Sequence, residues 1–202
     1  QRLQKEFPGK PAMVYSDLQV IDEAGNLLAD SAWRQLQLDP RFFTLNRLLI
    51  QNVPHGCAMM IDRAMQELVC PIPPEAMLHD HWIALSAVLL GAYQAIEMPL
   101  VLLRNHGSNV TRRPAGKGEK LERYLQNLRS DAAYESMVQL RVAQASALRE
   151  KYEKRLTEQQ HLTLDRFILL GSTRGFLRKW IYLRNGFFRT TWRHTIKMVL
   201  RG

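Results

Sequence analysis

Residues 78–104 read LHDHWIALSAVLLGAYQAIEMPLVLLR, and this segment decides the fold class. From Asp80 to Leu90 the residues favour a helix, and Gly91 follows at a position that glycine prefers after a helix end. From Tyr93 to Leu103 the chain is largely apolar and contains Pro99, which is typical of an extended segment. A helix that passes directly into a strand predicts an α/β fold.

The same segment also has features of a membrane span. Residues 82–103 form a run of 22 residues in which Glu97 is the only charge. Gly91 lies near the middle of this run, and Gln94, Glu97 and Pro99 lie in its second half, where they would interrupt a continuous apolar helix. We therefore expect a helix followed by a strand and not a transmembrane helix.

Short strands and turns are expected before this segment. Residues 11–22 form a β-type run, which ends in a turn at residues 23–26. Residues 56–61 predict a second short strand that is buried. This alternation of short strands and helices supports the α/β class.

The chain changes character after residue 106. Residues 107–118 are rich in turn-forming and basic residues, and predict a mobile loop or linker. Residues 119–161 show helical spacing, with Leu148, Tyr152 and Leu156 at every fourth position, and we expect two helices separated near residues 130 and 131. We thus expect three regions, which are an α/β part (1–112), a helical extension (113–162) and a basic aromatic tail (163–202).

The formal net charge of +9 comes from the C-terminal part. Residues 1–116 carry 10 Lys and Arg against 11 Asp and Glu, whereas residues 117–202 carry 18 against 8. In residues 163–202, nine basic residues and a single acid, Asp165, are interleaved with seven aromatic residues. This mixture favours an anionic membrane surface, where aromatic rings lie at headgroup level and cationic side chains reach the water. Nucleic acid attracts the same charges but is the weaker alternative, because no recognition motif of that class is present.

Two further features bear on the class of protein. Cys57 and Cys70 lack Cys-x-x-Cys spacing, and we expect both as free, buried thiols. The sequence starts at Gln1 with neither a methionine nor a signal segment, and we expect it to be part of a longer polypeptide.

Asp80 is the leading candidate for chemistry. It stands at the expected start of the helix, between His79 and His81. A carboxylate there can cap the helix by accepting backbone N–H groups, or it can act as a general base on a substrate hydroxyl, and both alternatives stay open. A zinc site built from these three residues and His106 matches no familiar ligand spacing. Trp82 is either a core residue or a platform on which a sugar stacks.

A second group of polar residues follows the expected strand. Arg104, His106 and Asn109 come at its carboxyl end, where open α/β sheets place ligands. Arginine can bind a diphosphate through paired hydrogen bonds, and histidine can contribute charge or ligate a metal. The alternative is that all three are solvated loop residues. Upstream, Asn52 and Gly56 flank a tight turn, in which glycine is expected for its backbone angle.

Taken in order, these motifs resemble a known family. The residues that carry the resemblance are Tyr15-Ser16-Asp17-Leu18, Leu48 to Asn52 running into Gly56 to Met60, His79 to Leu85, and Arg104 to Asn109. They look like the second half of a family 2 glycosyltransferase, and are most similar to the rhamnosyltransferase-like enzymes of bacterial surface-polysaccharide synthesis. The resemblance covers roughly residues 10–112. His81 departs from it, because the family usually has Trp at that position.

The resemblance implies a partial GT-A fold and inverting transfer of a sugar, such as rhamnose, from a nucleotide-sugar donor to a hydroxyl of a glycan or lipid-linked acceptor. It casts Asp80 as the general base and places Arg104, His106 and Asn109 near the donor diphosphate. The residues that it puts on the acceptor side are Asp17, Asn52, Gly56, His79, His81 and Trp82. A divalent metal, Mg²⁺ or Mn²⁺, is implied in the complete enzyme, with His106 as a candidate ligand in this chain.

The resemblance also implies that the nucleotide-binding half, with the acidic metal ligands, precedes residue 1. We therefore expect the isolated chain to be inactive, and the complete enzyme to work in the cytoplasm, peripheral at the inner face of the cytoplasmic membrane. The alternative function is that of a non-catalytic remnant that binds a membrane or a partner protein.

Overall fold

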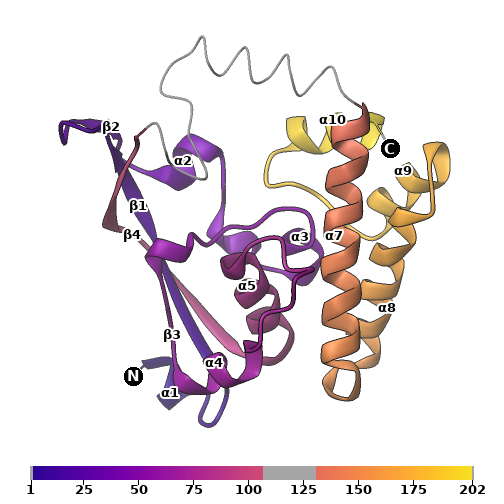
Figure 1. Cartoon of the computed structure of the whole chain (residues 1–202), viewed down its shortest axis with the longest axis horizontal. Coiled ribbons are helices and arrows are strands. Elements are labelled where there is room, and N and C mark those ends of the chain that lie inside the picture. Colours follow the sequence, from indigo (N-terminus) through magenta and orange to yellow (C-terminus); the bar gives the residue numbers. More distant parts are fainter. Residues whose placement is uncertain (1, 107–130, 202) are drawn as a thin grey trace.

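The structure, a computed structural model, describes residues 2–106 and 131–201. Figure 1 shows a long twisted sheet with short helices on one side of the molecule and a group of longer helices on the other. Helix α5 lies between the sheet and these longer helices. The described chain is therefore a mixed α/β structure with a helical C-terminal part, in agreement with the expected class.

Strand β1 (Ala12–Ile21) is the centre of a four-stranded mixed sheet. The strands β2 (Leu27–Ala29) and β3 (Met59–Ile61) pair with opposite ends of β1, both in antiparallel direction. Strand β4 (Ala92–Arg104) runs parallel to β1 along its whole length, from Ala12 opposite Ala92 to Ile21 opposite Arg104. Parallel neighbours need a long crossover connection, and here this connection carries the helices α2 to α5.

The helices fall into two groups along the chain. The N-terminal group comprises α1 (Arg2–Glu6), α2 (Ala32–Leu36), α3 (Leu45–Leu48), α4 (Arg63–Val69) and α5 (His79–Leu90), with the 3₁₀ turns η1 (Pro40–Phe42) and η2 (Gly56–Ala58). The C-terminal group comprises α7 (Asp131–Lys151), α8 (Glu158–Ile168), α9 (Gly175–Arg184) and α10 (Trp192–Arg201), with η3 (Glu153–Arg155) and η4 (Leu169–Gly171).

The predicted succession of helix, glycine and strand is confirmed as α5, Gly91 and β4. Glycine at position 91 is required by space, because a Cβ there would lie 2.7 Å from the carbonyl oxygen of Pro11 and 2.7 Å from Cε of Met65. The strand predicted at residues 11–22 and the following turn are also present. In the part of the chain that the structure describes, no helix has both the length and the apolar character to cross a membrane.

Three local predictions are wrong. The strand expected at residues 56–61 covers only Met59–Ile61 and is not buried, since the side chain of Met60 is largely exposed. Cys57 and Cys70 are free, as expected, but both are exposed.

The third error concerns the helical run expected at residues 119–161. Residues 119–130 lie outside the described residues, and α7 ends at Lys151. Helix α8 then starts after Thr157, whose side chain forms a capping box with Gln160. The Thr-x-x-Gln pattern of such a box is visible in the sequence, whereas the regular spacing of Tyr152 and Leu156 suggests an unbroken helix.

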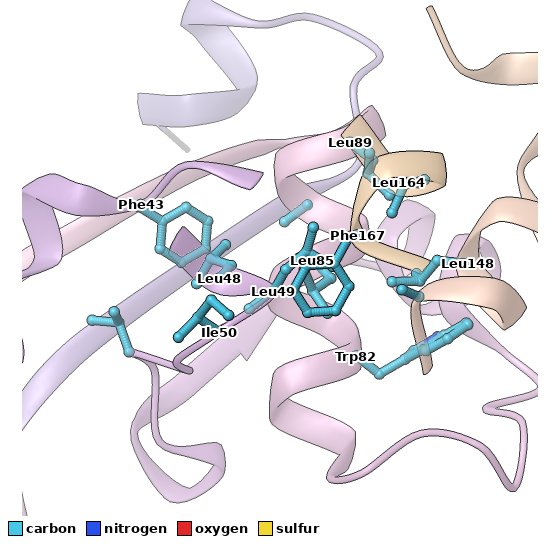
Figure 2. Close-up of a cluster of buried hydrophobic side chains, with 14 of the residues drawn as sticks. Phe43, Leu48, Leu49, Ile50, Trp82, Leu85, Leu89, Leu148, Leu164 and Phe167 are labelled. Carbon is cyan, nitrogen blue, oxygen red and sulfur yellow. The ribbon is translucent and has the colours of Figure 1, made fainter. Parts of the chain in front are cut away.

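One hydrophobic core joins the two groups of helices. Figure 2 shows Trp82, Leu85 and Leu89 of α5 together with side chains from the C-terminal helices. The latter are Leu148 of α7 and Leu164 and Phe167 of α8, and all three are fully buried. The first residues of the region 163–202 therefore belong to α8 and pack against the α/β part.

Polar contacts strengthen the same junction. The hydroxyl of Tyr152, just after α7, lies 2.9 Å from Oγ of Ser86 and donates to the carbonyl oxygen of Leu68 at 3.2 Å. The Nε2 atom of Gln160 donates to the carbonyl oxygen of Leu89 at 2.8 Å, which satisfies an acceptor in the last turn of α5. The C-terminal helices thus stabilise α5, and α5 carries Asp80.

Candidate active site

The carboxylate of Asp80 joins two motifs that are distant in the sequence. Asp80 stands in the first turn of α5, and its side chain is half-buried. Its Oδ2 atom accepts a hydrogen bond of 3.0 Å from the backbone N–H of Gly56, and Oδ1 accepts one of 2.7 Å from the backbone N–H of His81. A carboxylate offers about four lone-pair sites, so two of them stay available.

Asp80 acts only in part as a cap of helix α5. The cap residue of α5 is Leu78, which makes no side-chain cap hydrogen bond. Asp80 satisfies one N–H group of the first helical turn, that of His81, but its other hydrogen bond leaves the helix and holds Gly56. The negative charge is also well placed at the positive end of the α5 dipole.

Gly56 allows the side chain of His79 to approach closely, and its backbone angle does not require glycine. The glycines with positive φ in the described chain are Gly9, Gly25, Gly175 and Gly186, so the expected role of Gly56 in backbone geometry is wrong. A Cβ on Gly56 would lie 2.5 Å from Nε2 of His79 and 3.5 Å from Cβ of Asp80. The ring of His79, an exposed residue, therefore lies against Gly56, and the two motifs form one site.

Asn52 shapes the turn that presents Gly56. Its Nδ2 atom donates to the carbonyl oxygen of Pro54 at 3.0 Å. Its Oδ1 atom is buried without a hydrogen-bond partner. Asn52 is thus a positioning residue in this structure, held by the turn between α3 and η2.

His81 and Trp82 do not face an acceptor, in contrast to their predicted place on the acceptor side. The Nε2 atom of His81 donates to the carbonyl oxygen of Leu48 at 2.6 Å, and Nδ1 lies 3.3 Å from Nε2 of Gln144. Burial lowers the pKa of His81 from 6.5 to about 4, which keeps the ring neutral. Trp82 is fully buried, and its indole N–H donates to the carbonyl oxygen of Val69 at 3.3 Å.

Gln144 of α7 is a residue that the sequence analysis missed. Its Oε1 atom accepts from the backbone N–H of Met77 at 2.9 Å, and its Nε2 atom contacts His81. Gln144 therefore fixes the chain on either side of Asp80. No local signal marks it, because its function depends on how α7 packs against α5.

Asp17 lies apart from Asp80 and has a structural role. Its Oδ1 atom accepts from the backbone N–H groups of Leu18 and Trp33, at 2.8 and 3.1 Å, and its Oδ2 atom accepts from the hydroxyl of Ser31. These bonds tie α2 to the middle of β1. Asp17 also borders an open cavity of about 570 Å³ between β1, α2, η1 and β4, whose lining contains neither Gly56 nor Asp80.

The second polar motif is attached to a different turn. Arg104 donates from Nη1 to the carbonyl oxygens of Asp22 and Glu23, at 3.2 and 2.5 Å, in the turn between β1 and β2. Arg104 and His106 are exposed, and Asn109 lies outside the described residues. The contacts that hold Asp80 and those that hold Arg104 therefore involve separate loops.

The described residues do not fit a divalent-metal site. Across residues 2–106 and 131–201, no three His, Cys, Asp or Glu side chains come together in a way that could hold a metal ion. Among the expected diphosphate-side residues, only His106 both lies in the described part of the chain and has a side chain that can ligate a metal. We therefore assign no chemical step to a metal in this chain.

Five of the seven aromatic residues of region 163–202 are either clearly buried or clearly exposed. Phe167, Tyr182 and Phe187 are buried, whereas Phe176 and Trp180 are exposed on α9. The division was not predicted, since composition does not tell which side of a helix packs inward.

No protein-family model, curated protein or solved structure matches the chain. The assignment to a family thus stays a prediction that depends on the motifs and on the geometry around Asp80.

Proposed function

We propose that this chain is the acceptor-side part of an inverting family 2 glycosyltransferase with a GT-A fold, and that Asp80 is its general base. The observation that carries the proposal is the hydrogen bond between Oδ2 of Asp80 and the N–H of Gly56. This bond unites the two motifs that the family resemblance assigns to the acceptor side. It also leaves the carboxylate half-exposed and in a fixed orientation.

The reaction needs one carboxylate on the acceptor side. Asp80 accepts the proton of an acceptor hydroxyl while the hydroxyl oxygen attacks the anomeric carbon of the donor sugar. The bond from that carbon to the diphosphate oxygen breaks, the nucleoside diphosphate leaves from the opposite face, and the configuration at the anomeric carbon inverts. The hydrogen bonds from Gly56 and His81 hold the carboxylate in place, so that little reorientation is needed.

The remaining residues have supporting functions in this proposal. His79 lies against Gly56 on the exposed side and can contact the acceptor. Arg104, His106 and Asn109 are assigned to contacts with the donor diphosphate. The negative charge that develops on this leaving group needs cationic partners. In this proposal the family resemblance assigns the binding of the nucleotide, and the acidic ligands of a divalent metal, to a part of the enzyme other than this chain.

A second function, attachment to an anionic membrane surface, is favoured by a separate observation. Helix α9 exposes apolar and aromatic side chains beside basic ones. Attachment is compatible with the transferase, since it would place the protein at the inner face of the cytoplasmic membrane, next to a lipid-linked acceptor.

The test of the transferase proposal is an assay on the polypeptide encoded by the complete reading frame. A panel of nucleoside diphosphate sugars is incubated with a membrane extract that contains lipid-linked glycans, and the release of nucleoside diphosphate is measured. We expect release from one donor that depends on the acceptor extract. Absence of acceptor-dependent release from every donor would overturn the proposal.

A further inference from the structure

Helix α9 presents a continuous apolar face to solvent. Phe176 is 82% exposed and Trp180 is 49% exposed, and Leu177 and Leu183 are both more than half exposed. These four positions follow the i, i+1, i+4, i+7 spacing of one helix face. We call this set, Phe176, Leu177, Trp180 and Leu183, the α9 face.

The other side of α9 anchors the helix to the rest of the protein. Ile181 and Tyr182 are buried in the core, and the guanidinium of Arg178 is buried as well. Arg178 donates from Nη1 and Nη2 to the carboxylate oxygens of Glu135 on α7, at 2.7 and 3.0 Å, and from Nε to the carbonyl oxygen of Thr173 at 2.7 Å. The α9 face is thus held on a folded helix, and Figure 1 shows α9 on the outer side of the helical part, remote from the sheet.

The charged residues of the α9 segment that flank the α9 face are all basic. Arg174, Lys179 and Arg184 flank it, and the guanidinium carbon of Arg184 lies 5.8 Å from the ring centroid of Trp180. The sequence contains no Asp or Glu from residue 166 to residue 202. An occupant of this face must therefore offer both an apolar layer and negative charge.

We propose that the α9 face docks on an anionic lipid bilayer, with α9 parallel to the membrane plane. In this arrangement the aromatic and leucine side chains enter the boundary between headgroups and acyl chains, and the flanking basic side chains contact lipid phosphates. A second copy that docked through its own α9 face would bring the same positive charge and be repelled. Nucleic acid would pair with the charges but would leave the apolar rings in water.

This inference rests on the membrane attachment proposed above, and it narrows the anchor from the whole region 163–202 to one helix face. Phe167, Tyr182 and Phe187 pack inward and cannot reach a bilayer without unfolding. Because α9 is already folded and held by Arg178, docking requires no gain of helix. This property distinguishes the α9 face from a disordered basic segment that folds on a membrane.

The experiment measures cosedimentation of the full chain with vesicles of phosphatidylcholine alone or of phosphatidylcholine and phosphatidylglycerol. We compare the parent with a variant that carries Phe176→Ser and Trp180→Ser. The matched control carries Leu100→Ser and Leu102→Ser, which remove two exposed leucines of β4. We expect the parent and the control to bind the anionic vesicles, and the α9 variant to bind them at least tenfold more weakly. Circular dichroism should show no increase in helix when the parent binds.

Two results would overturn the proposal. One is an α9 variant that sediments with anionic vesicles as well as the parent does, and the other is a parent that binds neither vesicle, even if it binds a DNA duplex or a protein. Thermal unfolding of each variant verifies that it is folded, and a variant with Phe176→Ser alone is the substitute if the double variant is not. Since no sugar transfer is measured, failure here is distinguishable from failure of the transferase proposal.

Discussion

The buried imidazole of His81 makes the stability of the protein depend on pH, and replacement of His81 by Gln should remove this dependence. In the folded chain the ring is neutral, with Nε2–H donating to Leu48 and Nδ1 facing the amide of Gln144. A second proton would have to enter at Nδ1, where it would meet this amide donor and would leave a charge in the core. Burial therefore lowers the pKa of His81 to about 4.

The sign and size of the effect follow from linkage. As the pH falls through 6.5, His81 binds a proton in the unfolded chain, whereas the folded chain stays neutral until about pH 4. In this window the unfolded state holds the extra proton, so acid lowers the free energy of unfolding. At about 1.4 kcal/mol per pH unit the full window corresponds to about 3 kcal/mol, of which about 2 kcal/mol falls between pH 7.5 and pH 5.

Urea unfolding at pH 7.5 and pH 5 measures this effect. We expect the free energy of unfolding of the parent to drop by about 2 kcal/mol more than that of His81→Gln over the same interval. The control is His79→Gln, which replaces an exposed histidine two residues earlier and should keep the pH dependence of the parent. An equal drop in the parent and in His81→Gln would show that His81 is not held neutral, and would refute the reasoning.

Two further substitutions test the packing that supports the site. Phe167→Ala should lower the free energy of unfolding by about 3–5 kcal/mol in a single transition seen by all probes, because Phe167 lies in the core shared by α5 and α8; separate transitions for the two parts would contradict a shared core. Gly91→Ala should cost about 2 kcal/mol, because the new Cβ meets the carbonyl oxygen of Pro11 at 2.7 Å. Gly171→Ala, whose nearest contact is a valine methyl at 3.1 Å, is the milder control, and equal losses in the two variants would argue against the backbone clash.

The parts of the fold that sequence predicts correctly have local causes. Helix α5, Gly91 and β4 are marked by a helix-compatible run, a glycine and an apolar strand within residues 80–104. The break between α7 and α8 is not predicted. Tyr152 and Leu156 continue the helical spacing, but they flank the 3₁₀ turn η3 and pack against the core from there. From the sequence alone, an apolar residue that continues a helix cannot be told from one that packs into the core from a turn.

The sequence singles out candidate residues for the site, but it does not give their arrangement. The family resemblance makes Asp80 the general base and puts Gly56 on the acceptor side, but the hydrogen bond between them was not predicted. The burial of His81 and Trp82 depends on α7, a helix much further along the chain. This helix supplies Gln144, which contacts His81 although 63 positions separate them in the sequence. Such long-range contacts cannot be recognised from the neighbouring sequence. Residues next to a catalytic candidate are therefore easily predicted to line the substrate-binding surface when they are in fact buried.

The turnover number of Asp80→Asn, in the polypeptide of the complete reading frame and at saturating donor and acceptor, tests the central claim most directly. Asp62→Asn is its matched control, because Asp62 also accepts backbone N–H groups at the start of a helix, from Met65 at 2.7 Å and Ala12 at 3.1 Å. If Asp80 is the general base, its variant loses about a hundredfold or more in turnover while it stays folded, and Asp62→Asn keeps the turnover of the parent despite a stability loss of about 1 kcal/mol. Turnover in Asp80→Asn close to that of the parent would mean that the carboxylate only holds Gly56 in place.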